Sequence, residues 1–487
     1  MGPMTAPARD NPAVSAAVLV VAAAVALASA LPYAGCWNDG SRLATVEALV
    51  DQHTLAIDHS IFVEVPQPPR PAPYPPDEPD LLASGTRDKL FIDGHYYSDK
   101  SPVPALLLAA LYQVLQWATG LTARAHPGVF CYLMTVASSG LAYVVAVWSV
   151  YRLGRPLRLA LPWRLLLAAS FAFATVALPY ARQVNNHAVL LGVTAALLLA
   201  LAHLAEEARA GKWTWPRLLG VGALAGFGYA IDLGAGPVLL ACALALVAYR
   251  VRRPAGVALF LGGALPWLAL HHAVNYATGG TLGPANAVAA YFAWPGCPFT
   301  PENMTGGWKH DGLASFLWYA AELLVGKRGF LSHDLPLYLA VPALVALLWR
   351  RTAELPEVLF CCFFCGGTWL AYAANSNNLS GLCCSVRWFV PLLAPGYFAL
   401  ALLLREFPRR RAEFLVLSGW GLVLGAAMWA AGPWAKHMVH GFGPLAGVAL
   451  VWPVHAAALL SCAAVAAWQA QRGTPTSASA RPPAAAA

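Results

Sequence analysis

The sequence predicts an all-α polytopic membrane protein with about twelve transmembrane helices, outer-face juxtamembrane helices and two large extracytoplasmic loops. Of its 487 residues, 59% are hydrophobic and only 11% are charged, which is far more apolar than a soluble domain. Several runs reach the roughly 18–20 apolar residues needed to cross a hydrocarbon core of about 30 Å. The sequence lacks the long alternating pattern that is typical of a membrane β-barrel.

Twelve apolar segments account for the predicted membrane helices. They cover residues 13–32, 127–150, 164–181, 187–204, 217–233, 236–250, 255–273, 335–350, 356–374, 387–404, 412–431 and 445–468. The first segment could instead be a signal peptide, because Ala28-Ser29-Ala30 resembles a cleavage site. We favour a retained helix, and both interpretations place the chain from residue 33 onward outside.

Another apolar segment, residues 101–120, decides the side of every later loop. If it does not span, the most basic loops share one side, which the positive-inside rule assigns to the cytoplasm. Those loops carry Arg152/Arg155/Arg158, Arg209/Lys212, Arg250/Arg252/Arg253, Arg350/Arg351 and Arg405/Arg409/Arg410/Arg411. We therefore expect residues 101–120 to form a helix that lies in the membrane interface or re-enters it.

This topology divides the chain into six parts. They are the tail and first helix (1–32), an extracytoplasmic loop with interfacial helices (33–126), membrane helices (127–273), a second extracytoplasmic loop (274–334), the C-terminal membrane helices (335–468) and a disordered cytoplasmic tail (469–487). The two outer loops hold most of the acidic residues, so we expect the chemistry outside. The excess of Lys and Arg, 31 against 23 acidic residues, then reflects cytoplasmic loops and predicts no nucleic-acid binding.

Two features remain open at this level. The Pro-rich segment 64–80 is expected to be an extended, mobile insertion. Of the ten cysteines, six lie in apolar segments, where Cys behaves as a small hydrophobe. The other four, Cys36, Cys297, Cys383 and Cys384, lie in polar loops where one disulfide could form with a pairing that the sequence leaves undefined.

The first candidate for chemistry is Asp39, in the segment CWNDGSRLATVEALVDQ that follows the first helix. Asp39 or Ser41 can accept a backbone N–H and cap a helix that runs through Val50. Asp39 can equally serve as a general base at the boundary of water and lipid. The two roles are compatible, and Arg42 is a candidate for the same cavity.

The second candidate is the charged segment TRDKLFIDGHYYSDKSPVP, residues 86–104. It is either a solvated loop whose tyrosines anchor at the headgroups or part of an anion site. Lys100 directly precedes the Ser101-Pro102 pair at which the interfacial helix starts. An ammonium beside free helix N–H groups suits a lipid phosphate. The other cavity candidates in this segment are Asp93, His95, Tyr97 and Asp99.

Later outer helix ends supply further candidates. Arg387, in CCSVRWFVPLLAP, is either a snorkelling arginine or a second phosphate ligand. Asp232, in GYAIDLGAGP, is either a helix cap or a functional carboxylate near the surface. The remaining cavity candidates are Arg182 and Asn186 at one helix end, and Lys327, Arg328 and His333 before another.

These motifs resemble the GT-C superfamily of membrane glycosyltransferases, which includes the protein O-mannosyltransferases and the aminoarabinose transferase of lipid A. The family pattern Asp-Glu-x-Arg-Tyr is similar to Asp39-Gly40-Ser41-Arg42-Leu43 at the Asp and the Arg only. The family's Lys-Pro-Pro corresponds to Lys100-Ser101-Pro102, and its late Arg-Tyr/Trp-x-x-Pro to Arg387-Trp388-Phe389-Val390-Pro391. A second acidic position of the family falls on Asn185 or Asn186.

The resemblance implies a multi-pass protein of the bacterial inner membrane with a periplasmic active site. It also implies a polyprenyl-phosphate-sugar donor, such as an undecaprenyl or decaprenyl phosphate derivative. Asp39 would accept the acceptor's proton, and Lys100 and Arg387 would bind the leaving phosphate. Displacement with these groups on opposite faces of the sugar would invert the anomeric carbon. The acceptor could be a lipid, a glycan or a protein, and no metal is indicated, although a divalent ion is compatible with the sequence.

Two other classes of protein compete with this interpretation. A transporter or flippase of a lipid-linked or anionic solute would need charges near the bilayer midplane and broken helices. The middles of the predicted helices are almost free of charge, and no internal repeat is evident. A structural membrane protein without activity would not need the polar clusters predicted on the outer face.

Overall fold

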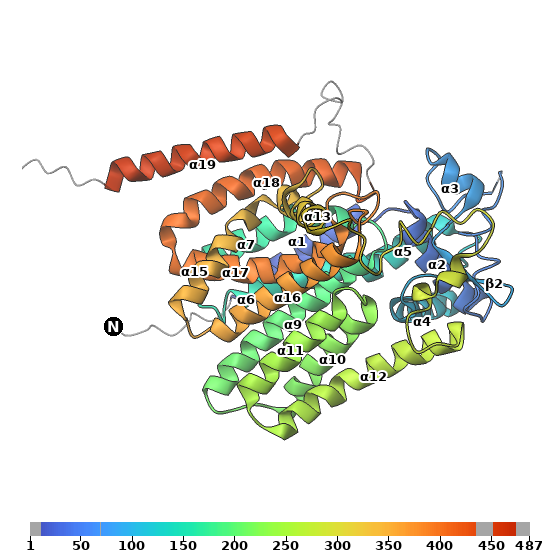
Figure 1. Cartoon of the computed structure of the whole chain (residues 1–487), viewed down its shortest axis with the longest axis horizontal. Coiled ribbons are helices and arrows are strands. Elements are labelled where there is room, and N and C mark those ends of the chain that lie inside the picture. The colour runs from blue at the N-terminus through green and yellow to red at the C-terminus, as the bar shows by residue number, and fades with distance from the viewer. Residues whose placement is uncertain (1–10, 69, 435–450, 474–487) are drawn as a thin grey trace, which may run out of the picture.

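The computed structural model describes residues 11–68, 70–434 and 451–473. Long helices form a bundle through most of the molecule, while the segment that follows α1 builds a separate polar cap at one end (Figure 1). The cap contains α2 (Trp37–Asp51), α3 (Pro79–Ser84), the hairpin of β1 (Lys89–Ile92) and β2 (His95–Ser98), and α4 (Pro102–Thr119). The small antiparallel hairpin departs from the all-α prediction.

The bundle is built from helices before and after the second outer loop. The first group is α1 (Pro12–Ser29), α5 (Pro127–Thr135), the π-helix η1 (Val136–Gly140), α6 (Leu141–Leu153), α7 (Leu161–Phe173), α8 (Ala177–Tyr180), α9 (Asn186–Arg209), α10 (Trp215–Ile231), α11 (Gly236–Val251) and α12 (Pro254–Gly279). The later group is α15 (Ala340–Arg350), α16 (Leu355–Asn375), α17 (Leu393–Glu406), α18 (Arg411–Ala431) and α19 (Val451–Gly473). Shorter elements connect them: η2 (Ala285–Ala287), η3 (Ala289–Phe292), α13 (Leu313–Val325), α14 (Phe330–His333), η4 (Leu335–Tyr338), η5 (Arg387–Leu392) and η6 (Pro408–Arg410).

Among the described residues, eight helices are long and apolar enough to cross a membrane. They are Pro12–Ser29, Pro127–Leu153, Asn186–Arg209, Pro254–Gly279, Leu355–Asn375, Arg387–Glu406, Pro408–Ala431 and Val451–Gln471. The other four predicted spans coincide with the shorter helices α7, α10, α11 and α15. The count of twelve therefore stays a prediction, and residues 445–450 of the last predicted span lie outside the described residues.

Helix α4 is present, but it is not one of these eight helices. Its start is set by Pro102, whose fixed φ suits the first turn of a helix. Tyr112 and Gln116 hold it to α2 through hydrogen bonds to Asp51 of 2.9 and 2.7 Å. The opposite face of α4 exposes an apolar stripe, as a helix lying on hydrocarbon would. That stripe is Leu107, Leu111, Val114 and Trp117.

Small residues let α10 and α12 pack closely. A Cβ atom on Gly222 would lie 1.9 Å from the Phe260 carbonyl oxygen, and one on Gly226 would lie 2.6 Å from Cα of Ala264. These two glycines are four residues apart and so share one helix face. Such pairs allow close helix approach in membranes, where van der Waals contact replaces the hydrophobic effect between helices.

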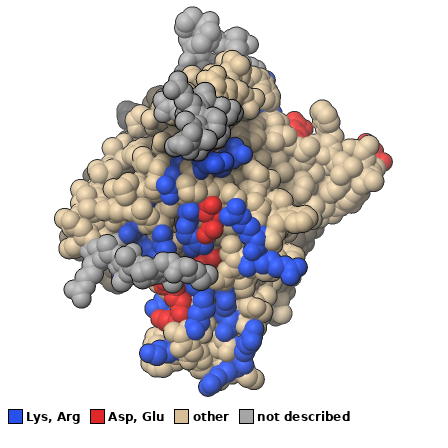
Figure 2. All heavy atoms as spheres, turned by 90° about the vertical axis from the view of Figure 1, so that its left-hand side faces the viewer, with Lys and Arg blue, Asp and Glu red and all other residues tan. Residues whose placement is uncertain are grey.

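Basic side chains gather at the end of the bundle opposite the cap (Figure 2). Arg152, Arg209, Arg250, Arg350 and Arg405 each occupy the last turn of a helix. Figure 2 also shows acidic groups between them, and the ion pairs Arg250–Glu357 and Arg405–Glu354 belong to this end. We call this end the basic end. Its composition is the one that the predicted topology places in the cytoplasm.

Two predicted segments differ in the structure. The Pro-rich segment 64–80 is anchored at its centre, where Tyr74 is buried and donates to the Phe62 carbonyl at 3.0 Å. Its ring lies against Gly40 of α2, so Tyr74 packs this part of the insertion against that helix. The predicted disordered tail begins too early, since α19 continues to Gly473. Residues 474–487 lie outside the described residues.

Candidate functional site

A cavity of about 610 Å³ lies where the polar cap meets the bundle. We call it the central cavity. The side chains that line it come from α2, the end of the hairpin, the start of α4, and the cap-facing ends of α9, α10, α12 and α16, together with the second outer loop and η5. Segments that are far apart in the sequence therefore meet around one space.

The hairpin positions the acidic residues of the cavity. Asp93 and Gly94 both have positive φ at its turn, and Lys89 pairs with Ser98 at the other end. Because Asp88 and Asp99 flank that last pair, the hairpin brings them side by side. Lys100 Nζ lies 2.7 Å from an oxygen of each carboxylate. One ammonium thus lies between two carboxylates.

The surroundings of Asp88 and Asp99 shift the pKa values of the two carboxyls in opposite directions. Burial raises the pKa of both, but at Asp88 the charges of Lys100, Arg387 and Arg42 outweigh burial and hold the pKa below its ordinary value. Burial raises the pKa of Asp99. The positive charge of Lys100 opposes this rise, and the negative charge of Asp88 adds to it. Oδ1 of Asp99 is buried and has no hydrogen-bond partner among the described residues. Carboxyls with divergent pKa values suit different roles in proton transfer.

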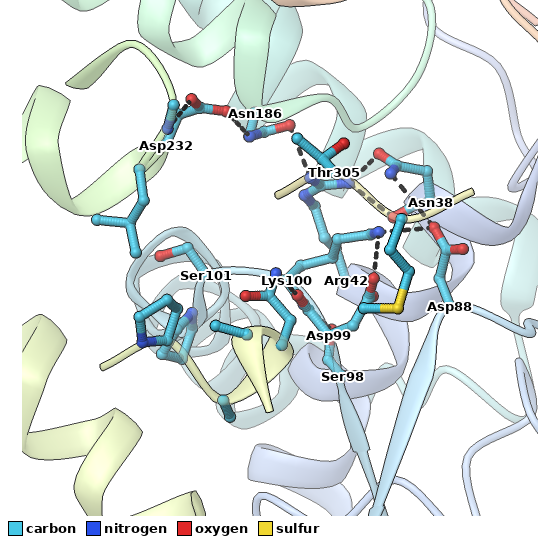
Figure 3. Close-up of a pocket in the computed structure, with 18 of the residues that line it drawn as sticks. Asn38, Arg42, Asp88, Ser98, Asp99, Lys100, Ser101, Asn186, Asp232 and Thr305 are labelled. Atoms are coloured by element: carbon cyan, nitrogen blue, oxygen red, sulfur yellow. Dashed lines mark hydrogen bonds and ion pairs between the residues drawn. The ribbon is translucent and has the colours of Figure 1, made fainter. Parts of the chain in front are cut away.

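A polar chain crosses the cavity from Asp99 to Asp232 (Figure 3). Asn38 donates to Asp88 at 3.3 Å, and its side-chain oxygen accepts from Arg42. Arg42 also donates to Asn186 Oδ1 at 2.6 Å, and Asn186 Nδ2 donates to Asp232 Oδ2 at 3.1 Å. Burial lowers the pKa of Arg42, with partial compensation by Asp99. The chain fixes the Arg42 guanidinium at the cavity wall.

Arg387 supplies a third cation at the start of η5. Its Nε is buried without a hydrogen-bond partner among the described residues, and its guanidinium lies 5.6 Å from the Trp434 ring centroid. The next residue, Trp388, stacks on Tyr372 at 4.4 Å with 5° between the rings. Tyr372 in turn donates to Asp232 at 3.0 Å. Arg387 therefore lines the cavity with donor capacity to spare.

Six of the sequence-predicted site residues line the central cavity. They are Arg42, Tyr97, Asp99, Lys100, Asn186 and Arg387. Asn186 follows the N-cap Asn185, whose side chain accepts the backbone N–H groups of His187 and Ala188 and so starts α9 beside the cavity.

Asp39, the predicted catalytic base, does not line the central cavity. It is fully buried, and its two oxygens accept the backbone N–H groups of Gly35 at 2.7 Å and Cys36 at 2.9 Å. Burial raises its pKa, and these hydrogen bonds oppose the rise. Successive helix residues point about 100° apart. On the first turns of α2, Asn38 and Arg42 face the cavity, and Asp39 faces the helix start.

Two predicted cavity residues on the hairpin also lie elsewhere. Asp93 forms its exposed turn, and exposed His95 pairs with Asp58 at 3.3 Å.

Four further predicted cavity residues lie away from it on later elements. Arg182 donates to the carbonyl oxygens of Trp429 and Ala430, and Lys327 is exposed. Arg328 donates to the carbonyl oxygen of Gly381 at 2.9 Å, and buried His333 faces the Gly329 carbonyl.

The fold also brings to the cavity Asp232, which the sequence indicated as a helix cap or a functional carboxylate, and several further residues. Asp232 caps α11 by accepting from Gly234 and Ala235, and it lines the cavity at the same time. His187 lies 3.3 Å from Asp232. The Asp-Gly pair at 93–94 is a strong hairpin signal, and it could have placed Asp88 opposite Asp99. Asn38, His271 and Asn275 carry no comparable signal.

A second, apolar hollow of about 380 Å³ adjoins the central cavity. Arg42 and Asn186 line both spaces. We call this hollow the apolar groove. Its other walls are the α4 residues Ala105, Leu107, Leu108 and Leu111 and apolar residues of α6, α9 and α10, among them Val145, Val189, Val193, Ala196 and Phe227. A polar site is therefore continuous with a space suited to hydrocarbon.

Among the described residues, no three His, Cys, Asp or Glu side chains are grouped so that they could hold a metal ion. Asp88 and Asp99 face a lysine, and Asp232 faces amide and hydroxyl donors.

No protein-family model and no curated protein matches the sequence. Solved structures that are similar to it include two of ArnT and one of an oligosaccharyltransferase. Crystal structures of ArnT from Cupriavidus metallidurans, bound to undecaprenyl phosphate and in the apo state, are 13% and 14% identical, each at a TM-score of 0.46. The alignments cover 96% of this chain and 82% and 81% of those chains.

The third similar structure is the Archaeoglobus fulgidus oligosaccharyltransferase in complex with Zn and sulfate. It is 14% identical at a TM-score of 0.42, over 86% of this chain and 54% of that one. At such scores, the function has to be inferred from the residues of the central cavity.

Proposed function

We propose that the protein is an integral-membrane glycosyltransferase of the GT-C type. It moves a sugar from a polyprenyl-phosphate donor to an acceptor on the extracytoplasmic face of a bacterial inner membrane. The observation that carries this proposal is the junction of two spaces, a cavity lined by three cations and an apolar groove that shares Arg42 and Asn186 with it.

The donor fits this junction by its chemistry. A polyprenyl chain needs an apolar channel, and the groove is bordered by α4, whose exposed stripe is apolar. The phosphate at the head of that chain needs cations, which Lys100, Arg42 and Arg387 supply. The groove ends at Arg42, so a lipid lying in it would present its phosphate to the cations and its sugar to the central cavity.

The cations then stabilise the charge that develops in the reaction. An acceptor oxygen attacks the anomeric carbon, the bond between that carbon and the phosphate oxygen breaks, and the polyprenyl phosphate leaves with the electron pair. Because the leaving phosphate is already acidic, it needs no proton, and preorganised positive charge is the useful catalyst. Inversion follows if the acceptor approaches from the face opposite the phosphate.

The acceptor's proton needs a base, and Asp99 is the best-placed group. It has a buried oxygen without a hydrogen-bond partner among the described residues, and its raised pKa brings a carboxylate closer to the range of an effective base. Asp88, with its lowered pKa, stays ionised and holds Lys100 in place. Asp99 thus takes the role that the sequence alone suggested for Asp39.

The experiment is a transfer assay with the purified protein in lipid nanodiscs. Tritiated undecaprenyl-phosphate sugars, offered one at a time, should yield labelled product and free undecaprenyl phosphate with at least one sugar. Binding of undecaprenyl phosphate should be detected by native mass spectrometry and lost in Lys100→Met. Absence of both binding and transfer would overturn the proposal, and movement of the intact labelled lipid between leaflets without bond cleavage would favour a flippase.

A further inference from the structure

The central cavity has two walls of opposite character. Every Asp, Lys and Arg that lines it comes from α2, the end of the hairpin, the residue after α10, or η5. The wall made by α12, residues 284–305, the end of α16 and the residues that follow it contributes, among the described residues, no acidic residue, lysine or arginine to the cavity lining. We call it the neutral wall, and its hydrogen-bonding residues other than His271 and Tyr372 are Asn275, Thr278, Asn286, Asn303, Thr305, Asn375 and Asn378.

Charges near the neutral wall are kept off the cavity. Glu302, Lys309 and Asp311 belong to the same outer loop, yet none of them lines the cavity, and Glu302 and Asp311 are exposed. Asn303 and Thr305 are the members of that stretch that do line it. The loop therefore presents amide and hydroxyl groups inward.

The neutral wall is held in place against the charged wall. Asn286 Nδ2 donates to the Asp99 carbonyl at 2.8 Å, and Asn378 Nδ2 donates to the Asn303 carbonyl at 3.0 Å. Phe292 packs with Leu90 and Ile92 of the hairpin in a small core. These contacts fix the wall before a ligand arrives, which reduces the entropy cost of binding.

Part of the wall's hydrogen-bonding capacity is left over. Asn275, Asn303 and Asn378 use both ends of their amides within the protein. In the part of the chain that the structure describes, no side-chain hydrogen bond engages the hydroxyls of Thr278 and Thr305 or the amide oxygens of Asn286 and Asn375. Hydroxyls donate and accept, and amide oxygens accept. This mixture matches a ligand whose own groups are hydroxyls.

The donor leaves this wall free. If the proposed function is correct, the donor's tail lies in the apolar groove. Its phosphate then binds the cations on the opposite, charged wall of the cavity. The neutral wall offers a charged acceptor no side chain of opposite charge with which to pair. An anionic acceptor would also have to share the cations with the donor phosphate.

We propose that the neutral wall is the acceptor subsite and that the acceptor is an uncharged, hydroxyl-rich glycan. This inference rests on the proposed function and narrows it. An acceptor hydroxyl held by Thr278, Thr305 and the two free amide oxygens attacks the anomeric carbon. Its proton passes to Asp99, and the polyprenyl phosphate leaves with the electrons of the broken bond.

The first test finds where the sugar goes. Envelope material from the cells that carry the protein is separated into neutral glycans and glycolipids, anionic glycans and glycolipids, cationic glycans and proteins. Each fraction is incubated with the nanodisc protein and tritiated undecaprenyl-phosphate sugars. The inference predicts at least roughly tenfold more label in the neutral fraction than in any other, in line with the cost of burying an unpaired charge.

The outcomes separate the two proposals. Label in an anionic, cationic or protein fraction overturns the neutral acceptor and leaves a glycosyltransferase. Absence of label from the neutral fraction overturns the neutral acceptor, whatever the other fractions show. If undecaprenyl phosphate also fails to bind, the proposed function fails with it.

A charge placed on the wall gives the second test. Thr305→Asp should lower kcat/KM for the neutral acceptor roughly tenfold and raise it for the same glycan carrying an amino group, because a new carboxylate pairs with an ammonium. Thr278→Val tests the wall again without adding charge, and should raise the acceptor KM alone. Glu302→Gln is the matched control in the same loop, outside the cavity. Unchanged acceptor preference in Thr305→Asp and unchanged KM in Thr278→Val would contradict the proposal.

Discussion

The two ends of the helix bundle use the same kinds of charged residue in different ways. At the basic end, arginine and glutamate pair side by side, as Arg250 does with Glu357 and Arg405 with Glu354 at 2.5 and 3.0 Å. At the cap end, Lys100 lies between Asp88 and Asp99, all three at least 86% buried. Figure 2 shows Lys and Arg side chains gathered over the surface of the basic end, and Figure 3 shows Asp88, Asp99 and Lys100 at a cavity.

The difference teaches which charges carry information about function. At the basic end, arginines ending successive helices indicate how the chain is oriented, and the largely buried Arg250 and Arg405 each have a glutamate partner. At the cap end, burial makes each charge costly, so its retention needs a reason. Arg387 and Asp99 keep buried polar atoms without hydrogen-bond partners among the described residues. We interpret those atoms as groups that bind or react.

The largest expected effect comes from removing the shared cation. Lys100→Met should lower the rate of transfer about 10³-fold, since the leaving phosphate loses a preorganised positive charge and two carboxylates lose their partner. The rate is measured with tritiated donor, and folding is monitored by the melting temperature. Arg409→Met, an exposed arginine of the basic end, is the matched control and should stay within about twofold, as surface changes usually do. Comparable losses of transfer rate in Lys100→Met and Arg409→Met would contradict a special role for the cations of the cap end.

The next effect concerns the base. Asp99→Asn should lower kcat about 10²-fold while undecaprenyl phosphate still binds, because only proton transfer is lost. In the wild type, the rate should rise with pH through the pKa of Asp99, above the range of an ordinary aspartate, because burial raises that pKa and only the carboxylate accepts a proton. An acid limb that persists unchanged in Asp99→Asn would assign it to another group.

A smaller effect should follow from filling the apolar groove. Ala196→Phe places a ring among Val193 and Phe227 at the groove wall. It should weaken binding of undecaprenyl phosphate roughly tenfold, about 1.4 kcal/mol, and leave binding of a short-chain prenyl phosphate nearly unchanged. Equal weakening of both lipids would mean that the tail lies elsewhere.

Asp39→Asn tests the predicted role of Asp39 as the base. Its carboxylate caps α2 and does not reach the cavity, so the variant should lose about 1 kcal/mol of stability and keep most of its transfer rate. The melting temperature and kcat are measured on the same preparation. A loss of kcat as large as that of Asp99→Asn would restore Asp39 as the base.

The smallest effect on transfer is expected at Glu47, which is buried in α2 away from the cavity. Burial raises its pKa to about 7, against hydrogen bonds from Ser60 and the Ile61 N–H. A raised carboxyl pKa means that the folded protein holds the proton more tightly. The stabilisation is therefore complete below about pH 4.5 and is lost as pH rises through about 7.

Glu47→Gln should flatten that dependence and change transfer little. Melting temperatures at pH 5 and pH 7.5 are compared between the variant and the wild type. The wild type should lose more stability than the variant over this interval. A greater loss in the variant would contradict the assigned cause.

Much of the site was predictable because it depends on helix ends and local motifs. Lys100 before Ser101-Pro102 and Arg387 before Trp388 stand at the starts of helical segments, and those positions were enough to place them at the cavity. Asp39 could not be placed, because its motif does not say which side of α2 faces inward. That choice depends on the tertiary packing of α2, which turns Asn38 and Arg42 to the cavity.

Other parts needed the three-dimensional structure for different reasons. Asp88 and Asp99 meet through a hairpin, which the local Asp-Gly turn signals. The helices that pack around this hairpin are distant in sequence, and no local pattern identifies them. The apolar groove and the neutral wall join α4, α9, α12 and the second outer loop, and no local pattern fixes such contacts. The bundle itself was predictable in kind, as membrane helices follow from hydropathy, while the count of twelve spans stays a prediction.

The most direct test is a cryo-electron microscopy structure of the protein in nanodiscs with undecaprenyl phosphate. We predict that the phosphate lies within hydrogen-bonding distance, about 3 Å, of Lys100 and at least one of Arg42 and Arg387, with the chain running into the apolar groove. A phosphate bound to arginines of the basic end, or a central cavity that stays empty of lipid at saturating concentration, would contradict the account.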